Sequence, residues 1–333
     1  MAHTHSASCA CSRRDFLGCG AFVAFSLAAG STLTRRAFAA PLAGETVRTE
    51  PFARVEKLAD GVWAVVSTPN ISGDMRTVSN GGIIAGRDAV LVVEGLNTPA
   101  GGAWLSETAR VLTGRRPTHV VLTHLHGDHS NGLAGHLGGA DAPTIIGTAT
   151  TRRLLAERNS APPQGEGAMR RTPNPIVLPD SVIVDEMQPT EIDLGGRAVR
   201  LTPRMGHSPS DLTVELLEPR VFWCGDLVFN GMFPYYGDAI PSKLGAACNS
   251  MLKDRDTTYI PGHGAVADSA ALAPYLALLA DVEAAARRAN EKGVPADEAW
   301  RTYETPAAIG EWAKFRPDVY RFAFEAWERE LKG

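Results

Sequence analysis

Cysteine, net charge and long hydrophobic runs are all scarce in this chain of 333 residues. The net charge of -4 at pH 7 gives no reason to expect nucleic acid or an anionic membrane surface as a partner. No internal repeat or low-complexity segment occurs, and nothing in the sequence fixes the oligomeric state. The chain is long enough, and with 44% hydrophobic residues apolar enough, to bury a substantial core without stabilising disulfides or metals.

The longest apolar run lies near the N-terminus and has the pattern of a secretory leader. Paired arginines precede it, and AFAAP follows with small residues at the spacing that a signal peptidase reads. The twin arginines favour Tat export to the periplasm, with cleavage after Ala39 or Ala40. The run is shorter than the roughly 20 residues of a spanning helix, so a membrane tether through an uncleaved leader is the alternative. We therefore assign residues 1–40 to a Tat-type signal peptide and 41–333 to a single domain.

Three of the five cysteines lie in this leader, which leaves Cys224 and Cys248 in the mature chain. In an oxidising compartment these two could form one disulfide. Cys224 lies in the apolar run VFWCGD, so a buried free thiol is the alternative.

Short apolar, β-branched runs alternate with helical patterns after the leader. Residues 41–54 (PLAGETVRTEPFAR) are expected to be a flexible entry, and SAPPQGEGAMRRTPNP a long loop. Helices are predicted in TPAGGAWLSETARVLTG, ending at Gly114, in TATTRRLLAERN, in PSKLGAACNSMLKDR and in the tail after Asp268. Strands are predicted at VWAVVS, in the hairpin GGIIAGRDAVLVVEG, and at HVVLTH, TIIGT, SVIVDEM, GGRAVRLTP, DLTVELLEP and RVFWCGD. This order predicts an α/β (α+β) fold with two sheets packed face to face and helices outside.

Histidine is scarce too, yet three of the 9 histidines fall in THLHGDH, positions 123–129, at the end of a predicted strand. Positions i and i+2 of an extended chain project to the same side, so His124 and His126 can bind one ion together. Asp128 and His129 lie one turn further on and can bind a second ion, while Gly127 permits a tight fold between the pairs. A helix N-cap is the alternative role for Asp128.

Three further segments place a histidine or an aspartate just beyond an apolar run, where side chains from distant positions converge. MGHSPSD supplies His207, WCGDLVF supplies Asp226 and YIPGHGAV supplies His263. Seven ligands are too many for one tetrahedral ion and match two divalent ions with a shared carboxylate. Imidazole and carboxylate groups suit Zn²⁺, and also Fe or Mn. His119 and His136 match no such segment and are expected to be structural.

The segments HLHGDH, GHSPSD, GDLVF and PGHG resemble the metal motifs of the metallo-β-lactamase fold superfamily, in order and at similar separations. The resemblance covers nearly the whole chain after residue 50. It implies a four-layer αβ/βα sandwich, with two mixed β-sheets flanked by helices and the metals at one edge. It also implies that Asp226 bridges two ions, as in the glyoxalase II and lactonase branches, whereas lactamase branches usually carry cysteine or serine there. The remaining ligands would divide into His124, His126 and His207 for the first ion and Asp128, His129 and His263 for the second.

This ligand set predicts a dinuclear zinc hydrolase that cleaves an ester, thioester, lactone or lactam bond in the periplasm by attack of a metal-bridging hydroxide. Asp128 and Asp226 are the expected catalytic residues, and Thr123 and Ser208 are neighbours expected to hold the imidazoles. The expected partner is a small-molecule substrate. Because glutathione thioesters belong mainly to the cytosol, an exported enzyme is expected to use another one. The alternatives are an iron-dependent persulfide dioxygenase-like oxidoreductase of the same fold, a β-lactamase, and an accessory protein of a periplasmic quinoprotein system.

Substrate contacts are expected from two segments near these ligands. Asn80 ends STPNISGDMRTVSNG, where the family often has a loop over the metals. NGMFPYYGD follows Asp226 and supplies Tyr235 and Tyr236, which could stack on a substrate or donate to an oxyanion. Packing within the loops is the alternative for each residue.

Overall fold

The structure is a computed structural model that describes residues 44–68, 73–139, 141–160, 176–180, 182–184, 188–252 and 256–333. All of these belong to one compact unit, Phe38–Gly333. The expected leader lies outside the described residues, as does most of the proline- and glycine-rich loop. Within the described part of the chain, no helix is both long and apolar enough to span a membrane.

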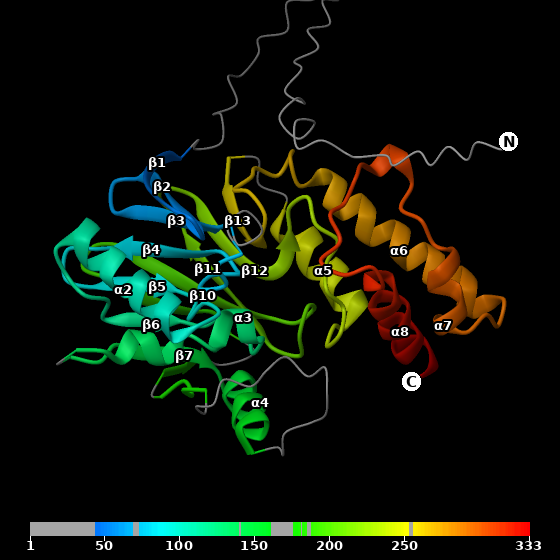
Figure 1. The fold of residues 1–333 in the computed structure, drawn as a ribbon, viewed down its shortest axis with the longest axis horizontal. Coiled ribbons are helices and arrows are strands. Elements are labelled where there is room, and N and C mark those ends of the chain that lie inside the picture. Colours follow the sequence, from blue (N-terminus) through cyan, green and yellow to red (C-terminus); the bar gives the residue numbers. More distant parts are fainter. Residues whose placement is uncertain are drawn as a thin grey trace, which may run out of the picture. The chain divides into compact units, whose positions relative to one another are not determined.

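The first inner layer is a mixed sheet of eight strands in sequence order (Figure 1). Neighbours from β1 to β5 run antiparallel, and neighbours from β5 to β8 run parallel. Its strands are β1 (Glu45–Glu50), β2 (Ala53–Ala59), β3 (Val62–Ser67), β4 (Gly81–Ala85), β5 (Val90–Val93), β6 (His119–Val121), β7 (Thr144–Thr148) and β8 (Val182–Val184).

The second inner layer is a mixed five-stranded sheet in the order β13-β12-β11-β10-β9. Only β12 and β13 are parallel neighbours among these described strands. The strands are β9 (Thr190–Asp193), β10 (Ala198–Arg204), β11 (Asp211–Leu216), β12 (Val221–Phe229) and β13 (Thr258–His263).

Helices cover the outer face of each sheet, which confirms the expected αβ/βα sandwich (Figure 1). Helices α2 (Pro99–Thr113) and α4 (Ala149–Ser160) pack on the first sheet. Helices α5 (Pro241–Met251), α6 (Ala273–Glu291), α7 (Ala296–Ala299) and α8 (Val319–Lys332) pack on the second sheet or on one another. The short helical turns are α3 (Gly127–Ser130), η1 (Leu133–Leu137), η2 (Trp300–Thr302) and η3 (Ala307–Ile309).

Adjacent residues on the central strands supply two different cores. On β5, Val90 and Val92 pack under the helices, while Leu91 and Val93 pack between the two sheets. Because successive side chains of a strand point to opposite faces, a strand covered on both sides must be apolar throughout. This is why the central strands appear in the sequence as uninterrupted apolar runs.

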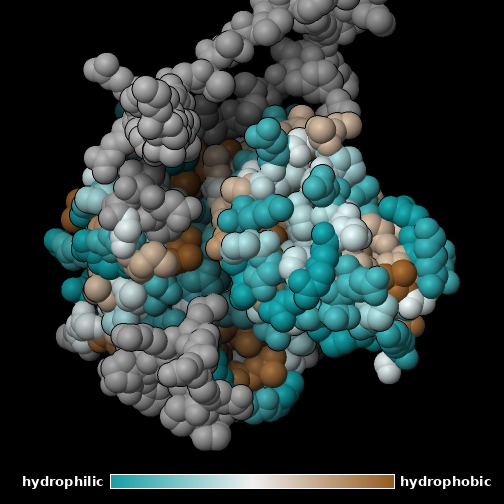
Figure 2. All heavy atoms as spheres, turned by 45° about the vertical axis from the view of Figure 1, so that its right-hand side comes forward, coloured by the Kyte–Doolittle hydropathy of each residue, from teal (hydrophilic) through white to brown (hydrophobic). Residues whose placement is uncertain are grey.

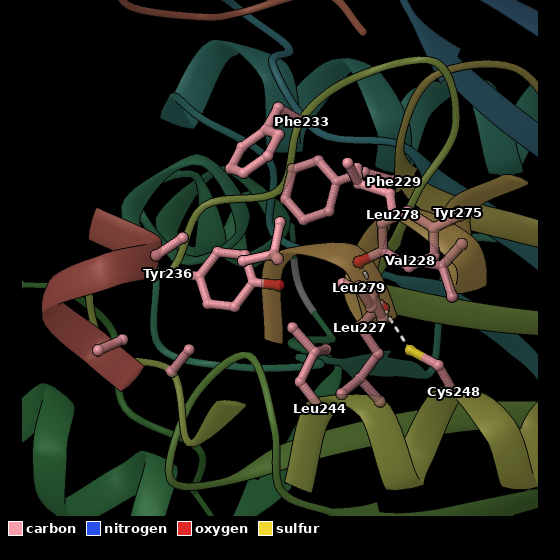
Figure 3. Close-up of a cluster of buried hydrophobic side chains, with 14 of the residues drawn as sticks. Leu227, Val228, Phe229, Phe233, Tyr236, Leu244, Cys248, Tyr275, Leu278 and Leu279 are labelled. Carbon is pink, nitrogen blue, oxygen red and sulfur yellow. Dashed lines mark hydrogen bonds between the residues drawn. The ribbon is translucent and has the colours of Figure 1, made fainter. Parts of the chain in front are cut away.

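The third core lies between the second sheet and the C-terminal helices (Figure 3). Cys224 and Cys248 are both buried there as free thiols, so the structure supports the alternative to a disulfide. The thiol of Cys248 donates to the carbonyl oxygen of Leu227 at 3.0 Å (Figure 3). Burial raises the pKa of both thiols, which keeps them protonated and inert.

Helix α2 begins and ends at the residues that its sequence predicts. The side chain of Thr98 accepts a hydrogen bond from the Gly101 N–H at 3.1 Å, and Pro99 occupies the first turn. Gly114 ends the helix with a φ of 75°, a left-handed conformation that favours glycine.

The expected flexible entry is wrong, because residues Glu45–Glu50 form the edge strand β1 paired with β2. The segment ETVRTE lacks a hydrophobic pattern, and most of its side chains are exposed or half-buried. Backbone pairing with β2 therefore holds this strand, and charged side chains suit an edge that must not pair further.

Candidate metal centre

The motif THLHGDH leaves the first sheet at the carboxyl end of β6 and enters α3. His126 precedes the helix in an extended conformation, with φ -63° and ψ 152°, and Gly127 begins it. The change from extended to helical backbone at Gly127 turns the chain between the two ligand pairs, as expected. A Cβ atom on Gly127 would lie 2.7 Å from the Asn131 side chain, so the close packing also favours glycine.

The first cluster joins three imidazoles and one carboxylate. His126 Nδ1 lies 3.1 Å from His124 Nε2 and 2.8 Å from His207 Nε2. Asp226 Oδ2 lies 3.3 Å from His207 Nε2 and 3.9 Å from His124 Nε2. These four ligand atoms are close enough together to hold one metal ion.

The second cluster lies on the other side of Asp226. Asp128 Oδ2 is 3.6 Å from His129 Nε2 and 3.2 Å from His263 Nε2, and the three groups could hold a second ion. Asp226 Oδ1 lies 3.1 Å from His129 Nε2 and 3.4 Å from His263 Nε2. Each oxygen of Asp226 therefore faces a different cluster.

The chemistry of these groups fits a pair of divalent cations. Within the described residues, the buried atoms His129 Nε2 and Asp226 Oδ1 have no hydrogen-bond partner, although an unpaired buried polar atom is costly. In the first cluster, three imidazole nitrogens converge within about the length of a hydrogen bond. A cation placed between such groups satisfies nitrogen lone pairs and carboxylate oxygens together.

Burial and opposite charges shift the pKa values of these groups in opposite directions. Burial lowers the pKa of His207 to about 3 and that of His124 well below its ordinary value. Burial also opposes charge on His263, but Asp226 and Asp128 outweigh it and raise the pKa of His263 to about 10. The same balance, with Asp226 as the largest favourable partner, raises the pKa of His129 well above its ordinary value.

Glu94 is a functional residue that the sequence analysis missed. It follows β5, is 1% exposed and has a φ of 80°. Its Oε1 atom accepts hydrogen bonds from His129 Nδ1 at 3.0 Å and from the Thr123 hydroxyl at 2.5 Å. That hydroxyl lies 3.0 Å from His124 Nδ1, so one buried carboxylate orients a ligand from each cluster. The signal in the sequence is a lone charge after the apolar run VLVV.

Two further carboxylates support the first cluster. Asp211 accepts the backbone N–H groups of His207 and Ser208 on Oδ2, at 3.0 and 3.1 Å, and the Ser208 hydroxyl on Oδ1 at 2.7 Å. Burial raises the pKa of Asp211 to about 7. Asp238 Oδ2 lies 2.8 Å from His126 Nε2. Of the two expected neighbours, Thr123 contacts an imidazole, whereas Ser208 fixes the loop through Asp211.

Asn80 lies near the centre but uses its side chain to join two loops. Its Oδ1 accepts from the Ser67 N–H at 2.9 Å, and its Nδ2 donates to the carbonyls of Pro261 and Gly264 at 2.9 and 2.8 Å. These bonds fix the backbone on both sides of His263. With 3% of its surface exposed, Asn80 positions this ligand and has no free polar atom for a substrate.

The two candidate tyrosines point in different directions. The ring of Tyr235 is half-buried, and its centroid lies 5.6 Å from that of His126. Tyr236 is 1% exposed and packs in the hydrophobic core of the C-terminal half (Figure 3), so it does not reach the metal centre. His136 is buried on a hydrogen bond with Ser106, and His119 lies on β6, so both are outside the two clusters.

Close packing also explains the glycine of PGHG. A Cβ atom on Gly262 would lie 1.9 Å from Asp226 Oδ1, which no side chain could tolerate. Since β12 and β13 are parallel neighbours, Asp226 and His263 meet at one edge of the second sheet. Glycine at 262 leaves the space that the Asp226 carboxylate occupies.

Comparisons with known proteins agree with this architecture. A metallo-beta-lactamase from Pontibacter korlensis is 19% identical with a TM-score of 0.55, over 69% of this chain and 99% of that one. A metallo-beta-lactamase from Hirschia baltica is 21% identical with a TM-score of 0.52, over 69% and 98%. A stereoselective inverting sec-alkylsulfatase from Pseudomonas sp. is 16% identical with a TM-score of 0.62, over 83% of this chain and 50% of that one. At these identities the likeness shows the fold alone.

The family itself is shown by the sequence. No curated protein matches the chain. Residues 75–263 match the model of the metallo-beta-lactamase superfamily, more than half of the chain, and this range contains all seven clustered ligands. The chain therefore belongs to the metallo-β-lactamase superfamily of metal-dependent hydrolases.

Proposed function

We propose that this chain is a dinuclear zinc hydrolase that cleaves an ester, thioester, lactone or lactam bond in the periplasm. The observation that carries the proposal is the position of Asp226, whose Oδ2 faces the first cluster and whose Oδ1 faces the second. A carboxylate shared in this way supports two ions held close together. When bound, such a pair supplies a water of lowered pKa and polarises the oxygen of the bond to be cleaved.

The clustered residues would hold the ions, and three of them exclude bulk water from the inner side of the centre. His124, His129 and His207 are 1% exposed or less, so no solvent reaches their inner side. Glu94 accepts a hydrogen bond from His129 Nδ1, which turns the Nε2 atom toward the second cluster. His129 is therefore oriented to bind metal at Nε2 once the proton there is displaced.

Three of the candidate ligands are partly exposed, and they mark the open side of the centre. The side chains of His126, Asp128 and His263 are 14%, 19% and 11% exposed. A substrate must therefore approach from their side. Asp128 is the only carboxylate among these three and is placed to accept a proton from the attacking water or to orient it.

The ligand set favours zinc, and metal analysis separates this proposal from an iron-dependent oxidoreductase of the same fold. We expect close to two zinc ions per chain and turnover of at least one substrate in a panel of aryl ester, thioester, lactone and nitrocefin. Asp226→Ala should lose most of the bound metal and of the turnover. The control is Asp60→Ala, because the Asp60 side chain is 96% exposed and belongs to neither cluster. Iron in place of zinc, or full turnover by the metal-free protein, would refute the proposal.

The periplasmic location rests on the leader and has its own test. Replacing Arg13 and Arg14 by lysine should leave the protein in the cytoplasmic fraction if the Tat route exports it. Unchanged export of this variant would contradict the assignment, and recovery of the native protein in the membrane fraction would favour the uncleaved tether.

A further inference from the structure

The C-terminal part of the chain returns to the metal centre. The family match ends at residue 263, and the chain continues through α6, α7 and α8 to Gly333. Between η3 and α8, the Ala313 N–H donates to the Gly231 carbonyl at 3.0 Å, and the Phe233 N–H donates to the Ala313 carbonyl at 2.9 Å. These bonds attach the segment 310–318 to the loop that follows β12 and carries Tyr235.

Three aromatic rings meet where the two segments join. The centroid of the Tyr235 ring lies 5.8 Å from that of Phe315 and 5.1 Å from that of Phe322. Both separations are in the range of favourable edge-to-face aromatic packing. We call Tyr235, Phe315 and Phe322 the aromatic wall.

One ring of the wall, that of Tyr235, lies beside the first cluster. The ring of Tyr235 packs edge-on against His126, at 5.6 Å between centroids, and lies 6.3 Å from the ring of His207. His126 is also one of the ligands that mark the open side of the centre. An apolar surface in this position can contact the part of a substrate next to the bond that is cleaved.

The exposure of Phe315 is unusual for so large an apolar ring. It is 47% exposed, whereas Phe233 on the neighbouring loop is fully buried. Figure 2 shows hydrophobic residues along the hollow beside the C-terminal helices. The outer surface of these helices is mostly polar. The guanidinium groups of Arg316 and Arg321 lie 4.8 and 4.9 Å from the ring of Phe322, and these cation–π contacts hold the ring in place.

We propose that the aromatic wall binds an apolar acyl chain or ring of the substrate, so that the enzyme prefers bonds with an apolar group on one side. The inference rests on the proposed hydrolase function, because it assumes that the bond is cleaved at the two clusters. Since two of the three rings come from beyond the family match, this preference belongs to the chain's own C-terminal segment.

Two measurements test the wall, one of catalysis and one of binding. The first compares kcat/KM for p-nitrophenyl acetate and p-nitrophenyl hexanoate. The second measures the dissociation constant of 4-phenylbutyrate by calorimetry, with the full chain loaded with zinc. Phe315→Ala should lower kcat/KM for the hexanoate and weaken 4-phenylbutyrate binding about two- to tenfold, the factor expected for a lost aromatic contact. The acetate should be cleaved as before, and metal content should not change.

Control variants separate the wall from general effects on folding. Phe315→Leu should restore part of the preference, because it keeps an apolar side chain. Leu217→Ala removes another exposed apolar residue, 50% exposed and outside the wall, and should change neither measurement.

The outcomes also separate the wall from the hydrolase function. If no ester is cleaved but 4-phenylbutyrate binds and Phe315→Ala weakens that binding, the result supports apolar binding by the wall and refutes the esterase activity. If esters are cleaved but Phe315→Ala changes neither chain-length preference nor binding, the wall is overturned alone. Absence of both cleavage and binding overturns both.

Discussion

Replacing Glu94 by glutamine tests whether one buried carboxylate orients both halves of the centre. Glutamine has nearly the same shape, so it creates no cavity, and it would adopt the same φ of 80° with similar strain. With its carbonyl in place of Oε1, glutamine could still accept from His129 and Thr123. Its amide group would then point at the Thr123 N–H, which now donates to Oε2 at 3.3 Å. Two donors would face each other in a buried site.

The expected size of the effect follows from these contacts. Hydrogen bonds to charged groups contribute about 1.5–3 kcal/mol, and a part of this is lost when the acceptor becomes neutral. Substitution of such supporting groups usually weakens metal binding about 10- to 100-fold. We therefore expect Glu94→Gln to weaken zinc binding by about that factor at both clusters, because Thr123 also contacts His124.

The assay is competition for zinc with a chromophoric chelator, which reports both dissociation constants. Glu107→Gln is the matched control, since Glu107 is a half-exposed carboxylate on α2 in an ion pair with Arg110. Unchanged zinc affinity in Glu94→Gln, with the control also unchanged, would refute the view that Glu94 orients the ligands. If zinc binding weakened only at the second cluster, the contact of Thr123 with His124 would have no effect on zinc binding at the first cluster.

Three other features can be tested in the same protein. Asn80→Ala should lower the free energy of unfolding by about 1–3 kcal/mol, measured in urea, and reduce zinc occupancy by loosening the loop of His263; unchanged values would contradict its positioning role. In the metal-free protein at pH 7, below their raised pKa values, His129 and His263 carry protons that zinc must displace. Calorimetry in two buffers of different ionisation enthalpy should therefore show proton release, and identical binding heats would argue against it. Because Cys224 and Cys248 are free thiols, dithiothreitol should leave Tm unchanged, and a fall in Tm would indicate a disulfide.

The inner strands and their helices were predictable because each carries a strong local pattern. The hairpin of β4 and β5 follows from two apolar runs divided by GRD, and α2 follows from its periodicity and the stop at Gly114. Strand β1 was not predictable, since ETVRTE has no apolar face and depends on pairing with β2. A polar edge strand leaves no local signal.

The candidate metal ligands could be located from sequence because histidine is rare and the motifs lie at strand ends. The supporting residues could not, because the lone charge of Glu94 after VLVV does not show which side chains it contacts, and nothing local distinguishes Asp238 from an ordinary charged residue. Asp238 contacts His126 across 112 positions, and Glu94 contacts His129 across 35. For Tyr236 the sequence suggested too much: it lies close to the Asp226 motif and was a candidate substrate contact, but its side chain packs in the core. Only the fold reveals which neighbours face the site.

The proposed function requires two cations that share the carboxylate of Asp226. Anomalous diffraction at the zinc absorption edge, from crystals of zinc-loaded protein, would locate these ions. We expect two peaks per chain, one next to His124, His126 and His207 and one next to Asp128, His129 and His263, with an oxygen of Asp226 bound to each. One peak, or two peaks that Asp226 does not join, would contradict it.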